Sequence, residues 1–174
     1  MTVYYDFDEV DSFTIAAVGA PGARTFFLQV RRGDTWVTVK CEKQQTAAMA
    51  AHIRKVLDDL PDSLPREILP LASEMEPWGP LEAAFVLGPI GLGYDREHDR
   101  VMVQLEEFSI VDDDELDLPD DVEGEASTVR AFLTRAQATA FCARTEQIVA
   151  AGRPPCRWCG GPVDPDGHPC PRMN

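Results

Sequence analysis

Four side chains of the kind that bind metal ions lie close together near the C-terminus. Cys156 and Cys159 are separated by two residues and are followed by glycine, a pattern that forms a tight turn whose amides can point at the sulfurs. His168 and Cys170 are two residues apart in the stretch that follows. In an extended segment such side chains lie on the same side, so one ion can bind both. Three thiolates and one imidazole complete a closed tetrahedral site, which is typical of structural zinc.

Alternatives remain open for this segment. Asp164 or Asp166 can replace His168 as the fourth ligand, and the cysteines can instead form a disulfide or remain free thiols in a disordered tail.

The acidic N-terminus does not resemble a signal peptide, and no apolar run reaches the ~20 residues of a membrane helix. We therefore expect a cytoplasmic protein, and in that reducing compartment cysteines serve as metal ligands before they form disulfides.

The rest of the sequence shows no pattern typical of an active site. It contains no nucleophile elbow, no phosphate-binding loop with lysine and no HExxH motif. Cys41 and Cys142 are expected to be small buried hydrophobes, and His52 and His98 to lie on the surface. The sequence favours a non-catalytic protein.

The elements that must position the metal segment follow a strand–strand–strand–helix order, which occurs twice. β-Branched and aromatic runs between Pro and Gly residues predict strands, and apolar residues at helical spacing predict a helix after each third strand. The first set covers residues 13–18, 26–30, 36–41 and about 43–59. The second covers 85–94, with a bulge near Gly88-Pro89, then 100–105, 128–133 and about 135–151.

The two predicted helices align without a gap, which indicates a duplication. Met49 then matches Phe141, and Thr134 with Gln137 forms a capping box at the second helix start. We predict an α+β fold in which two pseudo-symmetric βββα units share a mainly antiparallel sheet core. The alternative is that any two strand–helix junctions look alike.

The predicted domain organisation follows from these units. A duplicated domain covers residues 1–153, with repeat one at about 1–60, a proline-rich connector at 61–80 and repeat two at about 81–151. A small zinc-binding tail covers 154–174. The connector should contain one short helical turn at 66–71.

The strongly negative net charge makes some classes of binding partner less favourable than others. The net charge of −14, from 30 acidic and 16 basic residues, repels nucleic acids and anionic membranes. Another protein is the expected partner. Candidate contacts are Trp158, Arg153 and Arg157 in the tail, because Trp and Arg are enriched in hot spots, and an acidic stretch that includes Asp112, Asp113, Asp114 and Glu115. Trp158 can instead pack the tail onto the domain, and the acidic stretch can be a solvated insertion.

Residues 3–7, 24–29 and 152–172 carry a family resemblance. On them the chain resembles an uncharacterised actinobacterial family, a domain of unknown function described as a repeat protein. Cys156, Cys159, His168 and Cys170 match its tail motif position by position. The resemblance implies a bacterial cytoplasmic protein and no mechanism.

Two alternative functions remain. The order of elements is similar to the repeats of Pur-alpha and Whirly proteins, which bind single-stranded nucleic acid through basic and aromatic strand faces. Here such a face would use Arg24, Arg31, Arg32, Phe26, Phe27 and Trp36. The second alternative is an enzyme with a site between the two repeats. The prediction is a non-catalytic, zinc-binding protein-interaction or adapter module.

Overall fold

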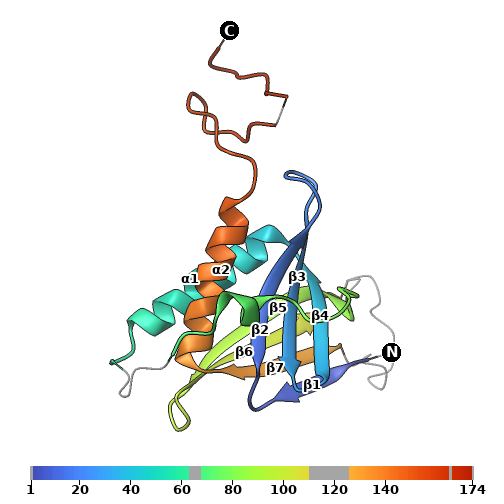
Figure 1. The fold of residues 1–174 in the computed structure, drawn as a ribbon, viewed down its shortest axis with the longest axis vertical. Helices are drawn as coiled ribbons and strands as arrows, with labels where there is room; N and C mark the ends of the chain where they lie inside the picture. Colours follow the sequence, from blue (N-terminus) through green and yellow to red (C-terminus); the bar gives the residue numbers. More distant parts are fainter. Residues whose placement is uncertain (1, 63–67, 110–125, 165, 174) are drawn as a thin grey trace, which may run out of the picture.

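A seven-stranded sheet with two long helices on one face forms the main body of the computed structural model (Figure 1). The structure describes residues 2–62, 68–109, 126–164 and 166–173. The elements of the first half are β1 (Tyr4–Phe7), β2 (Ser12–Val18), β3 (Thr25–Arg32), β4 (Thr35–Cys41) and α1 (Lys43–Asp58). A 3-10 turn, η1 (Ala72–Met75), precedes β5 (Phe85–Asp95), β6 (Arg100–Glu107), β7 (Thr128–Leu133) and α2 (Arg135–Ala150).

The sheet has the strand order β1-β7-β6-β5-β4-β3-β2. Strands β2–β4 and β5–β7 each form an antiparallel meander, which confirms the prediction of a mainly antiparallel sheet. Two parallel pairs were not predicted: β4 with β5, and β1 with β7. The first arises because α1 and the connector carry the chain back across the sheet, as a parallel connection requires.

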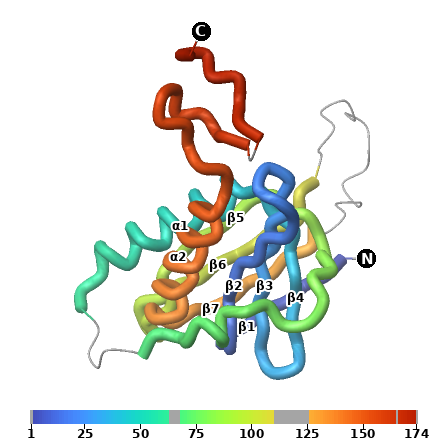
Figure 2. The backbone as a smooth tube through the Cα atoms, turned by 45° about the horizontal axis from the view of Figure 1, so that its top comes forward, coloured from blue at the N-terminus to red at the C-terminus, as the bar shows by residue number. Residues whose placement is uncertain are grey.

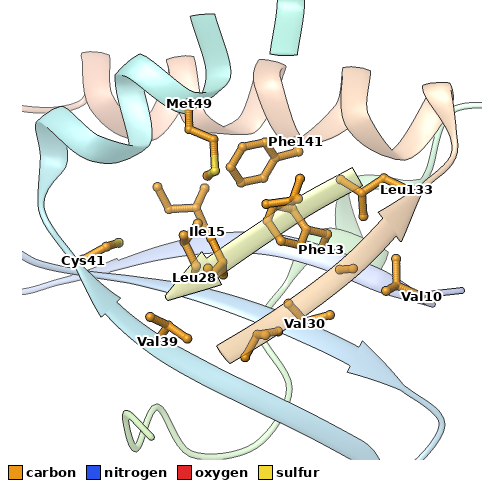
Figure 3. Packing of buried hydrophobic residues seen from close by; sticks show 14 of the residues in the cluster. Val10, Phe13, Ile15, Leu28, Val30, Val39, Cys41, Met49, Leu133 and Phe141 are labelled. Carbon is orange, nitrogen blue, oxygen red and sulfur yellow. The ribbon is translucent and has the colours of Figure 1, made fainter. Parts of the chain in front are cut away.

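The core lies between the sheet and the helices. Alternate residues of each strand face α1 and α2, and Figure 3 shows Phe13, Ile15 and Leu28 beneath the helices. The rings of Phe13 and Phe141 meet edge to face at 4.7 Å between centroids, an arrangement that adds to the burial of apolar area. Met49 is also fully covered.

Two apolar positions that helical spacing would place on the core side of α1 and α2 are only half-buried. They are Val56 and Ile148, each in the last turn of its helix. Ile53, by contrast, is completely buried nearer the middle of α1. The helix ends therefore contribute less to the core than their periodicity suggested.

The connector packs against the opposite, outer face of β2–β4 (Figure 1). Its short turn lies at Ala72–Met75, rather than at the expected 66–71, of which only 68–71 are described and are not helical. The Glu74 carboxylate accepts a hydrogen bond from the Leu71 amide at 2.6 Å, which fixes the start of the turn. The Thr14 hydroxyl donates to the Met75 carbonyl. Both faces of this half of the sheet are thus covered.

Both helices begin with the same arrangement. The side-chain oxygens of Gln45 and Gln137 each accept from the backbone N–H of the N-cap residue, Glu42 or Thr134, at 2.9 Å. This confirms the capping box predicted at Thr134. Each glutamine also donates to the carbonyl of a neighbouring segment, such as Val10 at 2.7 Å for Gln137. The shared geometry is consistent with a duplication, which itself stays a prediction.

The expected irregularity in β5 is present, because the pairing register with β6 shifts between Leu87 and Ile90.

Among the helices that the structure describes, none combines the length and the apolar character needed to cross a membrane.

Candidate metal centre

The first two ligands are positioned by a closed loop after the end of α2. The Cys156 amide donates to the Gly161 carbonyl at 2.7 Å, and the Gly160 amide donates to the Cys156 carbonyl at 2.8 Å. Gly160 has a φ of 74°, a conformation that costs glycine little and other residues more. The loop brings the sulfurs of Cys156 and Cys159 to the same side, in the tail that extends beyond the domain in Figure 2.

The second pair is brought back by a turn. The Gly167 amide donates to the Asp164 carbonyl at 2.9 Å, and Gly167 has a φ of 92°. His168 and Cys170 follow and turn their side chains toward the first two ligands. Behind them, the Met173 amide donates to the Cys170 carbonyl at 3.0 Å. The four predicted ligands therefore meet although two separate turns present them.

The ligand atoms are spaced as a tetrahedral metal site requires. All four lie within 4.8 Å of one another. The sulfurs of Cys156 and Cys170 are 3.9 Å apart, and the Cys159 sulfur lies 3.2 Å from Nε2 of His168. A tetrahedral zinc ion with bonds of ~2.3 Å to sulfur and ~2.0–2.1 Å to nitrogen would give separations of ~3.8 and ~3.6 Å. Cys156, Cys159, His168 and Cys170 are positioned to bind a metal ion, and the geometry is consistent with zinc.

The alternative ligand Asp164 is engaged elsewhere. Its carboxylate accepts a hydrogen bond from the Arg153 guanidinium at 2.8 Å. His168, in contrast, points its Nε2 at the cysteine cluster. This supports His168 over Asp164 as the fourth ligand. The ion pair of Arg153 with Asp164 also links the residues just after α2 to the metal-binding tail.

Electrostatics inside the cluster favour a bound cation. The backbone amides of Cys159 and Trp158 lower the pKa of the Cys156 thiol. The Arg172 amide acts in the same direction on Cys170, but burial and the two neighbouring thiols outweigh it, so the pKa of Cys170 is raised. Thiols this close cannot all ionise without a positive charge between them. A divalent ion removes that conflict, since thiolates are the form that binds metal.

The cysteines outside the tail have a different character. Burial raises the pKa of Cys41 to about 12 and that of Cys142 to about 11. The Cys142 thiol donates to the Ala50 carbonyl at 3.3 Å between α2 and α1. Both are buried and protonated, as expected for packing residues rather than nucleophiles. His52 and His98 lie on the surface, also as expected.

The candidate interaction residues differ in how far they are free to contact a partner. Trp158 is 51% exposed, and the Arg157 guanidinium lies 4.8 Å from the centre of its ring. Arg153 is committed to Asp164. Asp112, Asp113, Asp114 and Glu115 lie outside the described residues.

Three of the residues suggested for nucleic-acid binding, Phe26, Arg24 and Arg31, are buried or engaged within the protein. Phe26 is buried on the helix side, and Arg24 donates to the carbonyls of Ile148 and Ala151 at the end of α2. Arg31 lies over the ring of Trp78 in the connector, at 5.1 Å. The connector thus covers part of the strand face that such a function would need, whereas Arg32 is exposed.

A site between the two repeats was the other alternative. The strands β4 and β5 pair directly there, and α1 packs on α2. Between the helices lies an open groove of about 330 Å³, lined by three alanines of α1 and six larger residues of the two helices, among them Arg54 and Glu146, which form an ion pair at 2.6 Å. The hydroxyl of Thr145 in this lining is buried and has no hydrogen-bond partner among the described residues.

Sequence reasoning missed a polar cluster at the start of α2. Arg135 donates to the Asp99 carboxylate at 2.7 Å and to the Tyr94 hydroxyl at 3.1 Å. The Tyr94 hydroxyl donates to Asp99, and with Arg135 it lowers the pKa of that carboxyl. Asp99 has a φ of 52°, and an aspartate in a polar turn was the available signal. The cluster links the turn between β5 and β6 to the first residue of α2.

Comparisons with known proteins add a family match. The model of a family described as a protein of unknown function, DUF3090, matches residues 5–170. Neither the search of curated proteins nor that of solved structures finds a match. The matched range contains both strand–helix units and all four candidate metal ligands.

Proposed function

This chain belongs to the DUF3090 family of unknown function. From the geometry of its C-terminal segment we propose that it is a non-catalytic zinc-binding protein that serves as a protein-interaction module. The metal is Zn²⁺, held by Cys156, Cys159, His168 and Cys170. Three thiolates and an imidazole suit zinc better than calcium or magnesium, which prefer oxygen ligands. All four positions are filled by protein, so the ion has a structural use.

The burial pattern of the tail supports a structural metal. Among its described residues, 154–164 and 166–173, only Cys156 and Cys170 are buried. So short a segment cannot form an apolar core, and metal ligands commonly replace one at this size. Bound zinc supplies the free energy that orders the segment.

The observation that carries the interaction proposal is the exposure of Trp158. Half of this side chain is open to solvent, on a lobe that has no apolar interior for it to enter. The stacked Arg157 guanidinium gives it a flat, amphipathic surface. Trp and Arg are among the residue types that are enriched in the hot spots of protein interfaces.

A capture experiment with matched variants tests the proposal. The tagged full chain, Trp158→Ala and Met173→Ala are each used to retrieve partners from the native cell extract. Met173 is the control because it is another exposed apolar side chain of the same lobe. We expect one stoichiometric protein with the wild type and Met173→Ala, and its loss with Trp158→Ala at unchanged zinc content. Retrieval of nucleic acid alone, or of the same protein by Trp158→Ala, would show the proposal to be wrong.

A further inference from the structure

The helices α1 and α2 lie side by side on the sheet, with a groove between them (Figure 1). At one turn they are linked by the Cys142 thiol, which donates to the Ala50 carbonyl at 3.3 Å. At the next turn Arg54 of α1 forms its ion pair with Glu146 of α2. Three alanines of α1 line the groove, and side chains this small leave space between helices that longer ones would fill. The resulting volume of about 330 Å³ lies within the range of small-molecule sites.

The hydroxyl of Thr145, in the lining of this groove, lacks a hydrogen bond. The side chain is 1% exposed, and its Oγ1 has no partner among the described residues. The other two threonines of α1 and α2 are satisfied within their own helix. The Thr46 hydroxyl donates to the Lys43 carbonyl at 2.9 Å, and the Thr139 hydroxyl donates to the Arg135 carbonyl at 2.8 Å. A buried hydroxyl without a partner costs free energy that a ligand oxygen bonded to Thr145 would recover.

The charged side chains that line the groove cancel one another. Arg54 and Lys55 are its cations, and Asp58 and Glu146 are its anions. Lys55 and Asp58 are three residues apart and both are exposed on α1. An ionic ligand would therefore meet charges of both signs, and it would lose hydration where it lies against the alanines and Val149. The lining favours a neutral molecule.

The ion pair of Arg54 with Glu146 is the contact that can open to admit a molecule to the covered hydroxyl. The two side chains are 43% and 61% exposed. Exposed ion pairs contribute little to stability, so their separation costs little. The buried contact of Cys142 with Ala50 keeps the helices together meanwhile.

We propose that the groove between α1 and α2 binds a neutral small molecule that has an apolar body and one oxygen bonded to the Thr145 hydroxyl. The apolar body lies against the alanines of α1 and Val149 of α2. Since a cavity of ~150 Å³ takes benzene, a groove of about 330 Å³ holds roughly ten non-hydrogen atoms. None of the metal ligands lines this groove, so the proposal does not depend on the function proposed for the tail.

The test uses the zinc-loaded full chain and three eight-carbon probes of different charge: 1-octanol, octanoate and octylammonium. We expect 1-octanol to shift the amide resonances of residues 47–58 and 142–149 in a saturable way, and the two ions to bind about tenfold more weakly or less. Thr145→Val should weaken the binding of 1-octanol by about fivefold, because one hydrogen bond is lost while the shape is kept. In the ligand-free protein the same variant should raise the melting temperature by about 2–4 °C, because the unpartnered hydroxyl is removed.

Thr139→Val is the matched control, because it removes a hydroxyl that is bonded within the same helix and lies outside the groove lining. It should leave the affinity for 1-octanol unchanged and should not raise the melting temperature. A lower melting temperature of Thr145→Val would show that the hydroxyl has a partner in the folded chain, and would overturn the proposal. So would amide shifts that are absent or lie outside α1 and α2, binding of either ion as tight as that of 1-octanol, or equal affinity of Thr145→Val and wild type.

Discussion

Replacing Gln29 with alanine should destabilise the main domain far more than the same substitution at Gln104. Gln29 is 3% exposed and makes hydrogen bonds to both backbone groups of Trp78 and, at 3.0 Å, to the Thr38 hydroxyl. Each such bond contributes about 1 kcal/mol, and the partners left unpaired add to the loss. The expected cost is about 2–3 kcal/mol, which lowers the melting temperature of a chain this size by roughly 4–12 °C.

Gln104 provides the comparison because it is also a glutamine in the middle strand of an antiparallel meander, β6, but holds no described chain segment. Its substitution should change the free energy of unfolding by less than about 0.5 kcal/mol. Urea denaturation of both variants gives the two free energies. Amide exchange locates the change, because the connector amides from Glu74 to Gly79 should lose protection in Gln29→Ala alone. Equal destabilisation by the two substitutions would mean that the Gln29 bonds do not hold the connector.

Three further predictions concern the tail and the polar cluster. Protein purified without added metal should contain about one zinc per chain by elemental analysis, and Cys159→Ser should lose it while the circular dichroism of the domain stays unchanged; a metal-free but ordered tail would contradict this. Iodoacetamide at about pH 8 should spare Cys41 and Cys142, whose pKa values of about 12 and 11 keep them protonated, and label the three tail cysteines only after chelation; labelling before chelation would count against a bound metal. Asp99 has a lowered pKa, chiefly through the Tyr94 hydroxyl, so its contribution to stability is present above its unfolded pKa and is lost as pH falls through the lower folded value. Asp99→Asn keeps the left-handed backbone, which Asn tolerates, and should flatten that part of the acid-unfolding curve; an unchanged curve would exclude the charge as the cause.

Local patterns predicted most of the strands and helices, because their determinants lie within each segment. In β6 the residues Val101, Val103 and Leu105 alternate with half-exposed neighbours, as a strand covered on one side requires. Each helix begins directly after a strand at a capping residue that can be read from the sequence. The metal ligands were predictable for the same reason, since all four lie within one short segment.

The missed features depend on contacts between distant segments. β1 is only four residues long and has one buried side chain, Phe7, so its pairing with β7 leaves no local signal. The parallel contact of β4 with β5 depends on the path of the connector, which no single segment encodes. Gln29 looked like an ordinary polar residue of a strand, because its function is defined by Trp78, 49 residues away in the chain.

The order of the two halves explains how the outer face of β2–β4 comes to be covered. After α1 the chain must return to the sheet to begin β5, and the connector makes that return across the outer face of β2–β4, where Gln29 and Thr14 hold it. After α2 the described chain continues into the metal lobe. Gln29 and Thr14 thus attach the return path to the strands, so that one segment both connects the two halves of the sheet and covers the outer face of the first half.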